Sequence, residues 1–99
     1  MSPERDGLAE LDEIERVFAA LAHASRRQIL GVLKARGGRV KAGDIAGRFA
    51  CSWPTTTRHL RVLEDAGLVR VEQAGRERWY VLEAKKLRSV AGGWLRSLA

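Results

Sequence analysis

Short hydroxyl side chains stand beside arginines between residues 52 and 69, and this mixture of residue types can read nucleic acid. Serine and threonine hydroxyls approach base edges closely, while arginine binds phosphate oxygens or guanine. A helix is expected here, because Ser52 can cap its amino end, Pro54 suits its first turn and Gly67 suits a left-handed residue beyond its carboxyl end. The predicted DNA-binding residues of this segment are Ser52, Trp53, Thr55, Thr56, Thr57, Arg58 and Arg61.

Some positions of this helix have two readings. Leu60 and Leu63 fall at helical spacing and can face a core, and the same spacing allows Thr56 to join them. The indole of Trp53 can stack on a deoxyribose or touch a thymine methyl, or it can pack against Phe49. His59 can read a base directly, or it can support packing and backbone positioning.

Charge is distributed unevenly along the 99 residues, whose formal net charge is +6. Residues 1–22 contain two arginines and six acids, whereas residues 23–99 contain sixteen basic residues and six acids. A basic surface favours a polyanionic partner. We therefore expect double-stranded DNA to contact the basic remainder of the chain and not its acidic beginning.

Helical, extended and turn signals follow one another in the order of a winged helix-turn-helix, a mainly α fold with a β-hairpin wing. Five helices and two to three short strands are expected in one domain over residues 1–99, with residues 1–7 frayed. The predicted elements are a helix over 8–22, a helix opened by Ser25 and ended by Gly37, an extended stretch at 39–41, a helix-turn-helix over 42–66, a hairpin over 69–82 and a closing helix over 84–98.

The predicted hairpin turns at Gly75 and carries Arg76 and Arg78 at its tip. Both arginines are predicted DNA-binding residues, placed to touch a phosphate backbone or a minor groove. Alternation along the two strands predicts that four apolar residues share one face of the hairpin, namely Val69, Val71, Trp79 and Val81.

The first and last helices each carry an apolar stripe that needs a partner surface. Gly92 and Gly93 interrupt the last helix, and each costs roughly 1 kcal/mol relative to alanine. Close approach of another helix would justify that cost, and a weak helix end is the alternative. The predicted dimer-interface residues are Leu11, Ile14, Phe18, Leu87, Val90, Trp94 and Leu98.

The chain resembles the ArsR-type bacterial transcriptional repressors over residues 17–30, 52–69 and 75–82, and more loosely from about Leu11 to Leu98. The most specific stretch runs from Thr57 to Val69. The resemblance implies a homodimer whose first and last helices form the interface, with paired recognition helices in successive major grooves. It also implies an inverted-repeat operator and repression of transcription.

Metal sensing is common in that family, but the residues that it needs are missing here. The family's thiolate site uses Cys-x-Cys in the short third helix, and residues 41–49 contain neither cysteine nor histidine. The family's other site uses histidines and carboxylates on the last helix, and residues 84–99 contain neither. We expect no metal, no cofactor and no metal sensing, as in the subset of the family that lacks both sites.

The remaining residues favour a cytoplasmic DNA-binding protein over other classes. Cys51 is the single cysteine, and the chain shows no secretion signal and no apolar run of about 18 residues that would span a membrane. An enzyme is not expected, because His23 and His59 have no obvious catalytic partners. The alternative functions are a protein-interaction winged helix, or a sensor of thiol oxidation at Cys51 or of a small molecule, with weak DNA specificity. No residue identifies an inducer.

Overall fold

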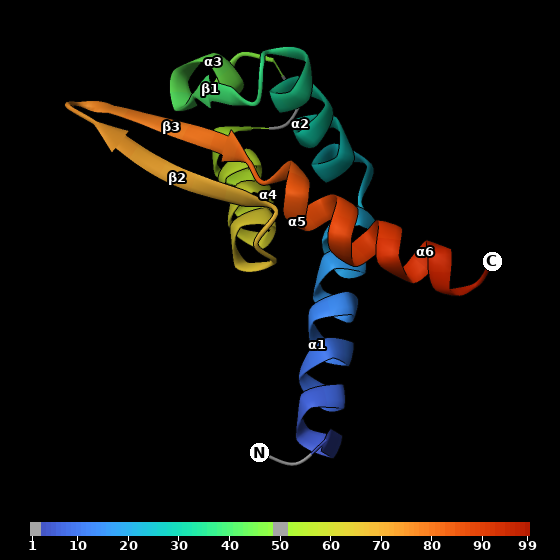
Figure 1. Ribbon diagram of the computed structural model, residues 1–99. Coiled ribbons are helices and arrows are strands. Elements are labelled where there is room, and N and C mark those ends of the chain that lie inside the picture. The colour runs from blue at the N-terminus through green and yellow to red at the C-terminus, as the bar shows by residue number, and fades with distance from the viewer. Residues whose placement is uncertain (1–2, 49–51) are drawn as a thin grey trace.

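A computed structural model describes residues 3–48 and 52–99, and its elements follow the predicted winged helix-turn-helix order. The hairpin extends away from the helices on one side of the molecule, and α6 ends on the other side (Figure 1). The elements are α1 (Pro3–Leu21), α2 (Ala24–Ala35), β1 (Arg39–Lys41), α3 (Ala42–Ala46), α4 (Trp53–Asp65), β2 (Val69–Ala74), β3 (Glu77–Leu82), α5 (Ala84–Leu87), the π-helical segment η1 (Arg88–Gly92) and α6 (Gly93–Ser97).

The core holds α4 against the other elements by one face only. Leu60 and Leu63 of α4 are almost fully buried, and so are Ile29 and Leu33 of α2. The core is completed by Val17, Ala20, Leu30, Val40, Ile45, Ala66, Leu68, Val69 and Tyr80. Because the apolar stripe of α4 is used in this way, its opposite face is turned outward.

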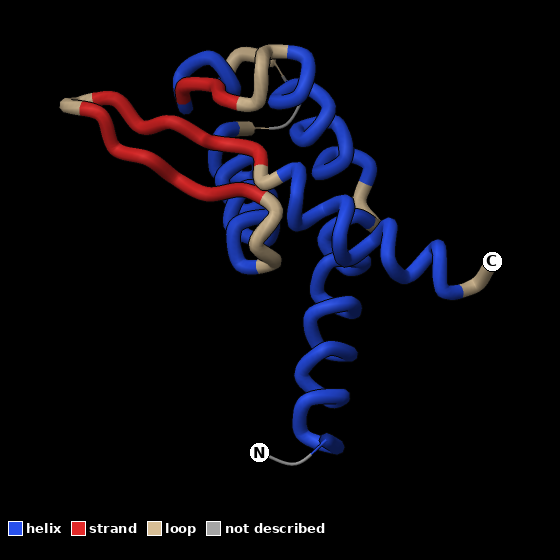
Figure 2. Tube along the Cα trace, in the orientation of Figure 1, coloured by secondary structure: helices blue, strands red, loops and turns tan. Residues whose placement is uncertain are grey.

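The three strands form an antiparallel sheet in the order β1-β3-β2 (Figure 2). Val71 pairs with Tyr80 and Glu72 pairs with Trp79. The prediction that Trp79 and Val81 share a face with Val69 and Val71 is therefore wrong. Residues 75 and 76 alone connect the strands, and loop length fixes the register. This register puts Tyr80 on the core side, where it is 3% exposed, and Trp79 on the outer face.

The helix boundaries differ from expectation at two places. The first helix begins at Pro3, so residues 3–7 are helical in the structure; proline suits the first helical position, and acids stabilise a helix amino end. The predicted fraying of this end stays a prediction. The second helix is capped by His23 and not opened by Ser25, because the Nδ1 atom of His23 accepts a hydrogen bond from the Ser25 N–H at 3.3 Å. The N-terminal part of α1 extends away from the other elements (Figure 1).

The closing helix is one helical run with a π-helical segment in its middle. Residues 3–48 and 52–99 thus contain five helical runs and three strands, as expected. A methyl group added at Gly92 would lie 3.2 Å from Nη1 of Arg96, and one at Gly93 would lie 4.0 Å from Nη2 of the same residue. No atom of another helix of the described chain lies within 4 Å of the added methyl position at either glycine, although Gly93 lines a hollow together with Glu13 and Ile14 of α1. A tight helix contact at the two glycines is therefore not seen within one protomer. None of the helices within residues 3–48 and 52–99 combines the length and hydropathy that a membrane span requires.

Candidate nucleic-acid interface

Both ends of α4 are fixed by local hydrogen bonds. At the amino end, Ser52 Oγ accepts from the Thr55 N–H at 3.4 Å and donates to Thr55 Oγ1 at 3.1 Å. At the carboxyl end, Gly67 adopts φ +77°, and the Leu68 N–H donates to the Leu63 carbonyl at 3.0 Å. This is a Schellman ending, which favours glycine at the left-handed position. The predicted capping of α4 is confirmed.

Thr56 is the predicted DNA-binding residue that the structure places in the core. Its side chain is 1% exposed, and its Oγ1 donates to the Ser52 carbonyl at 3.1 Å. Because Thr56 stands four residues before Leu60 and seven before Leu63, it lies on the same buried face of the helix. The prediction that Thr56 contacts DNA is therefore wrong.

The outward face of α4 carries the other predicted residues. Ser52, Arg58 and Arg61 are exposed, and Trp53 is 40% exposed. Thr55 and Thr57 are half-buried on the two flanks of the helix. Within the described residues, neither Arg58 nor Arg61 forms an ion pair, so their guanidinium groups are available to a ligand.

A notch of about 140 Å³ joins α4 to the wing. Arg78 lies two residues before Tyr80 on β3, and it faces the same side of the sheet as α4. Its guanidinium carbon lies 5.8 Å from the centre of the Tyr80 ring, a cation–π distance. The notch is lined by Thr57, Arg61, Glu64, Arg78 and Tyr80. The recognition helix and the wing thus present two arginines to one space.

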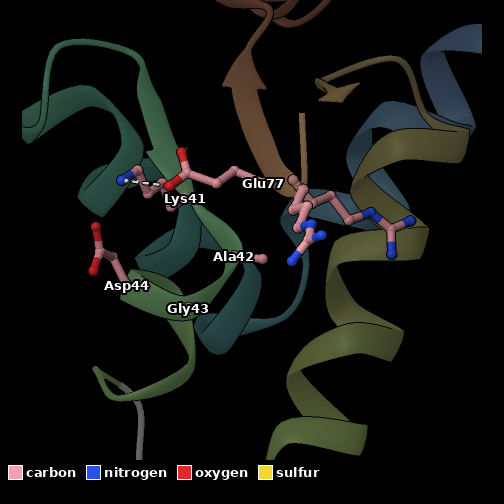
Figure 3. A pocket seen from close by; sticks show the side chains of 7 residues that line it. Lys41, Ala42, Gly43, Asp44 and Glu77 are labelled. Atoms are coloured by element: carbon pink, nitrogen blue, oxygen red, sulfur yellow. Dashed lines mark ion pairs between the residues drawn. The ribbon is translucent and has the colours of Figure 1, made fainter. Parts of the chain in front are cut away.

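A second hollow, of about 360 Å³, lies where the wing meets the start of α3 (Figure 3). Its lining includes Arg76 and Arg78, which form no ion pair in the described chain. Lys41 points toward Glu77 and pairs with it at 3.1 Å. Lys41 was not among the residues predicted from sequence, because its position beside the wing depends on the pairing of β1 with β3. The basic character of residues 39–41 was the available signal.

Ion pairs occupy the outer face of the sheet. Arg39 Nε lies 3.2 Å from Glu72, and Arg70 pairs with Glu72 and, at 2.7 Å, with Glu83. Hydrogen bonds from Arg70 and then Arg39 hold the pKa of Glu72 below its usual range. The guanidinium of Arg39 also lies 3.9 Å from the centre of the Trp79 ring. The basic residues of this face are neutralised by neighbours, whereas those facing α4 and the wing tip are not.

Comparison with known proteins agrees with this arrangement. Residues 21–72 match a family described as a helix-turn-helix domain. The chain is 36% identical over 74 residues to the transcriptional repressor SdpR of Bacillus subtilis, which covers 75% of this chain and 80% of that protein. The chain is a member of the ArsR-type family of winged helix-turn-helix transcriptional regulators.

Solved ArsR-type structures share the whole architecture. An ArsR-like transcriptional regulator from Rhodococcus sp. RHA1 is 31% identical, with a TM-score of 0.72, and the match covers 89% of this chain and 88% of that one. A homodimeric winged helix-turn-helix DNA-binding domain from Mycobacterium bovis is 28% identical, with a TM-score of 0.74, and the match covers 98% and 87% of the two chains.

In this ArsR-type chain, the side chain of His59 connects α4 to α2. Its Nδ1 lies 3.4 Å from Nη1 of Arg26, and its ring centre lies 4.5 Å from that of His23. The Nε and Nη2 atoms of Arg26 donate to the carbonyls of Ala20 and Ala19 at 2.7 and 2.9 Å, which anchors the end of α1. Burial lowers the pKa of His59, and the positive charges of His23, Arg26 and Arg58 lower it further.

The predicted dimer-interface residues divide into two sets in the single chain. Leu87 and Val90 are half-buried against the core, and Phe18 meets Trp94 edge to face with ring centres 5.1 Å apart. Large apolar residues remain exposed on α1 and at the end of the chain, namely Leu8, Leu11, Trp94, Leu95 and Leu98. Leu8 and Leu95 were not among the predicted interface residues. Ile14 is half-buried.

Two other predictions concern residues at or near the gap in the description. Cys51 and Phe49 lie outside the described residues, so the thiol and the packing of Trp53 on Phe49 stay predictions. Among the residues that are described, no three histidine, cysteine, aspartate or glutamate side chains gather closely enough to hold a metal ion.

Proposed function

We propose that two copies of this chain bind an inverted-repeat site on double-stranded DNA and repress the promoter that it overlaps. One observation carries this proposal: four arginines, two on α4 and two on the wing, are exposed on neighbouring surfaces and lack ion pairs within the described chain. They are Arg58, Arg61, Arg76 and Arg78. Elsewhere on the same sheet, Arg39 and Arg70 are paired with glutamates.

Affinity and sequence preference come from different groups in this proposal. The wing arginines and Arg61 contact phosphates, which supplies most of the affinity and makes it strongly dependent on salt. Arg58 and the hydroxyl of Thr57 read base edges, and each good contact contributes on the order of 1–3 kcal/mol of discrimination. Thr55 keeps a hydroxyl hydrogen for a base, since its oxygen already accepts from Ser52.

Dimerisation supplies the second half of the binding surface. The exposed apolar residues of α1 and of the last helix offer apolar surface to a second copy, and the related Mycobacterium bovis domain is homodimeric. A twofold dimer places half-sites about one helical turn, roughly 34–36 Å, apart. Bound over a promoter in the cytoplasm, the dimer would exclude RNA polymerase.

Selection of bound duplexes from a fragmented genomic library tests this function, with washing at about 0.15 M salt to reduce non-specific binding. We expect recovery of a shared imperfect inverted repeat. Recovery without any shared sequence would contradict sequence reading and would leave only charge-driven binding. A variant with Arg58 and Arg61 both changed to alanine provides the control, because it should recover no enriched repeat.

A further inference from the structure

An apolar hollow of about 280 Å³ lies away from the DNA-facing surface, where α2 meets the end of β3 and the start of α5. Four leucine side chains form its walls: Leu21, Leu30, Leu82 and Leu87. They come from the end of α1, from α2, from β3 and from α5. The hollow therefore lies at the junction of the wing, α2, the first helix and the last helix.

Gly31 forms part of this hollow, although α2 itself does not need a glycine there. Gly31 lies inside α2 with ordinary helical backbone, where glycine destabilises a helix relative to alanine. A methyl group at this position would meet no atom within 4 Å. Gly31 thus lowers the stability of α2 although no neighbouring atom in the described chain requires a glycine there. The absence of a side chain at Gly31 leaves the hollow open.

The charged groups at the hollow are both positive. Arg27 and Lys34 line it together with Gly31 on one face of α2, and no acid lines it. The Nη1 atom of Arg27 donates to the Leu21 carbonyl at 2.7 Å, which holds the guanidinium at the edge of the hollow. Lys34 forms no ion pair in the described chain. An anionic group at the rim would meet two cations.

We propose that this hollow binds a small amphipathic carboxylate, with its apolar body between the leucines and its carboxylate between Arg27 and Lys34. The volume lies just below the roughly 300–1,000 Å³ of typical small-molecule sites, which selects short acyl or aryl bodies. Occupation would change how α5 leaves β3 and so alter the geometry of the dimer on DNA. That regulatory consequence rests on the proposed function, whereas the binding itself does not.

Nuclear magnetic resonance titration of the DNA-free protein tests the binding with three probes that share one apolar body: octanoate, octan-1-ol and octylammonium. We expect saturable shifts of the Gly31, Leu82 and Leu87 amides with octanoate. Binding of the other two should be weaker by about tenfold or more, because a charge-assisted hydrogen bond is lost. Equal binding of octylammonium, or no saturable shift with octanoate, would overturn the proposal.

Variants separate the hollow from the rest of the surface. Gly31→Leu should fill the hollow and abolish octanoate binding while the helical circular dichroism is retained, because its side chain enters open space. Lys34→Gln should weaken octanoate binding, whereas Lys85→Gln, at an exposed lysine outside the hollow, should not. Unchanged octanoate binding by a folded Gly31→Leu variant would place the site elsewhere.

Sedimentation of the Gly31→Leu variant tests whether a second copy of the chain, and not a carboxylate, occupies the hollow. A shift to monomer, together with no octanoate binding by the unmodified protein, would assign the hollow to the dimer interface and overturn the carboxylate site. If the duplex selection fails but octanoate binds as expected, the site stands and the proposed DNA function does not.

Discussion

The two exposed faces of the molecule differ in the kind of group that they leave uncovered. The face formed by α4 and the wing presents arginines without acidic partners, among them Arg58 and Arg78. The face formed by α1 and α6 presents large apolar side chains, among them Leu11 and Leu98. Unpaired cations suit a polyanion, whereas apolar side chains suit a protein surface. The two faces therefore suit the separate roles proposed for them, one in binding DNA and the other in binding a second copy.

The largest expected effect is on dimerisation, when Trp94 is substituted. Trp94 and Trp53 are 41% and 40% exposed, but they lie on different faces. Trp94→Ala should weaken dimerisation by at least about 2 kcal/mol, roughly 30-fold, as expected for a tryptophan at the centre of an interface. Sedimentation velocity measures this shift toward monomer. Trp53→Ala serves as the matched control and should leave the dimer intact.

A Trp94→Ala variant that remains fully dimeric at all concentrations would show that α6 does not form the interface. A monomeric Trp53→Ala variant would show that the two faces are not separate. DNA affinity should fall in Trp94→Ala as a consequence of the lost dimer, and a covalently linked pair of chains should restore it.

Arg58→Ala tests base reading on the DNA-facing side. We expect specific affinity to fall by about 1–3 kcal/mol, with relaxed preference at one base pair of each half-site and an intact dimer. Competition binding against single-base variants of the operator measures the preference. A folded variant with unchanged preference would remove Arg58 from the reading residues.

The wing arginines should change salt dependence more than sequence preference. Arg78→Ala should reduce the slope of log K against log salt concentration by about one for each protomer's phosphate contact. Arg70→Ala is the control, because Arg70 lies on the outer face of the sheet and pairs with Glu72 and Glu83. Equal changes in slope for the two variants would contradict the division between the two sides of the sheet.

The smallest expected effect concerns pH and the contact of His59 with α2. Its pKa is lowered in the folded protein from the ordinary 6.5, so below about pH 6.5 the unfolded chain binds this proton more readily than the folded chain. Stability should fall as pH decreases through that value and should level off below the folded pKa. Thermal unfolding at about pH 7.5 and about pH 5.5 should show a smaller loss in Tm for His59→Gln. Parallel losses in both proteins would contradict this role for His59.

The helix α4 could be predicted from sequence because its signals are local. Ser52, the leucine spacing and Gly67 each act within a few residues of α4, and the structure confirms them. The prediction that Thr56 contacts DNA was wrong because a short hydroxyl side chain suits both a base edge and a buried first turn of a helix. Helical spacing pointed to the buried alternative, and the structure bears it out.

The sheet and the last helix could not be predicted in the same way. The face of Trp79 depends on the register of β2 with β3, which a one-residue change in the loop reverses. The position of Lys41 depends on pairing between strands that are almost forty residues apart. The π-helical segment at Arg88–Gly92 has no marker in the sequence beyond the two glycines at its end. The contacts of the exposed apolar side chains of α6 could not be predicted either, because the pattern of one chain does not specify the surface that would cover them.

Sedimentation equilibrium of the protein on its selected duplex, compared with a duplex that carries one half-site, measures whether DNA binding and dimerisation act together. We expect two protomers on the full inverted repeat and much weaker binding to the half-site, since a dimer bound at two half-sites gains both sets of arginine contacts. One protomer on the full site with equal affinity for the half-site would contradict the claim that DNA binding and dimerisation use two separate faces of the chain together.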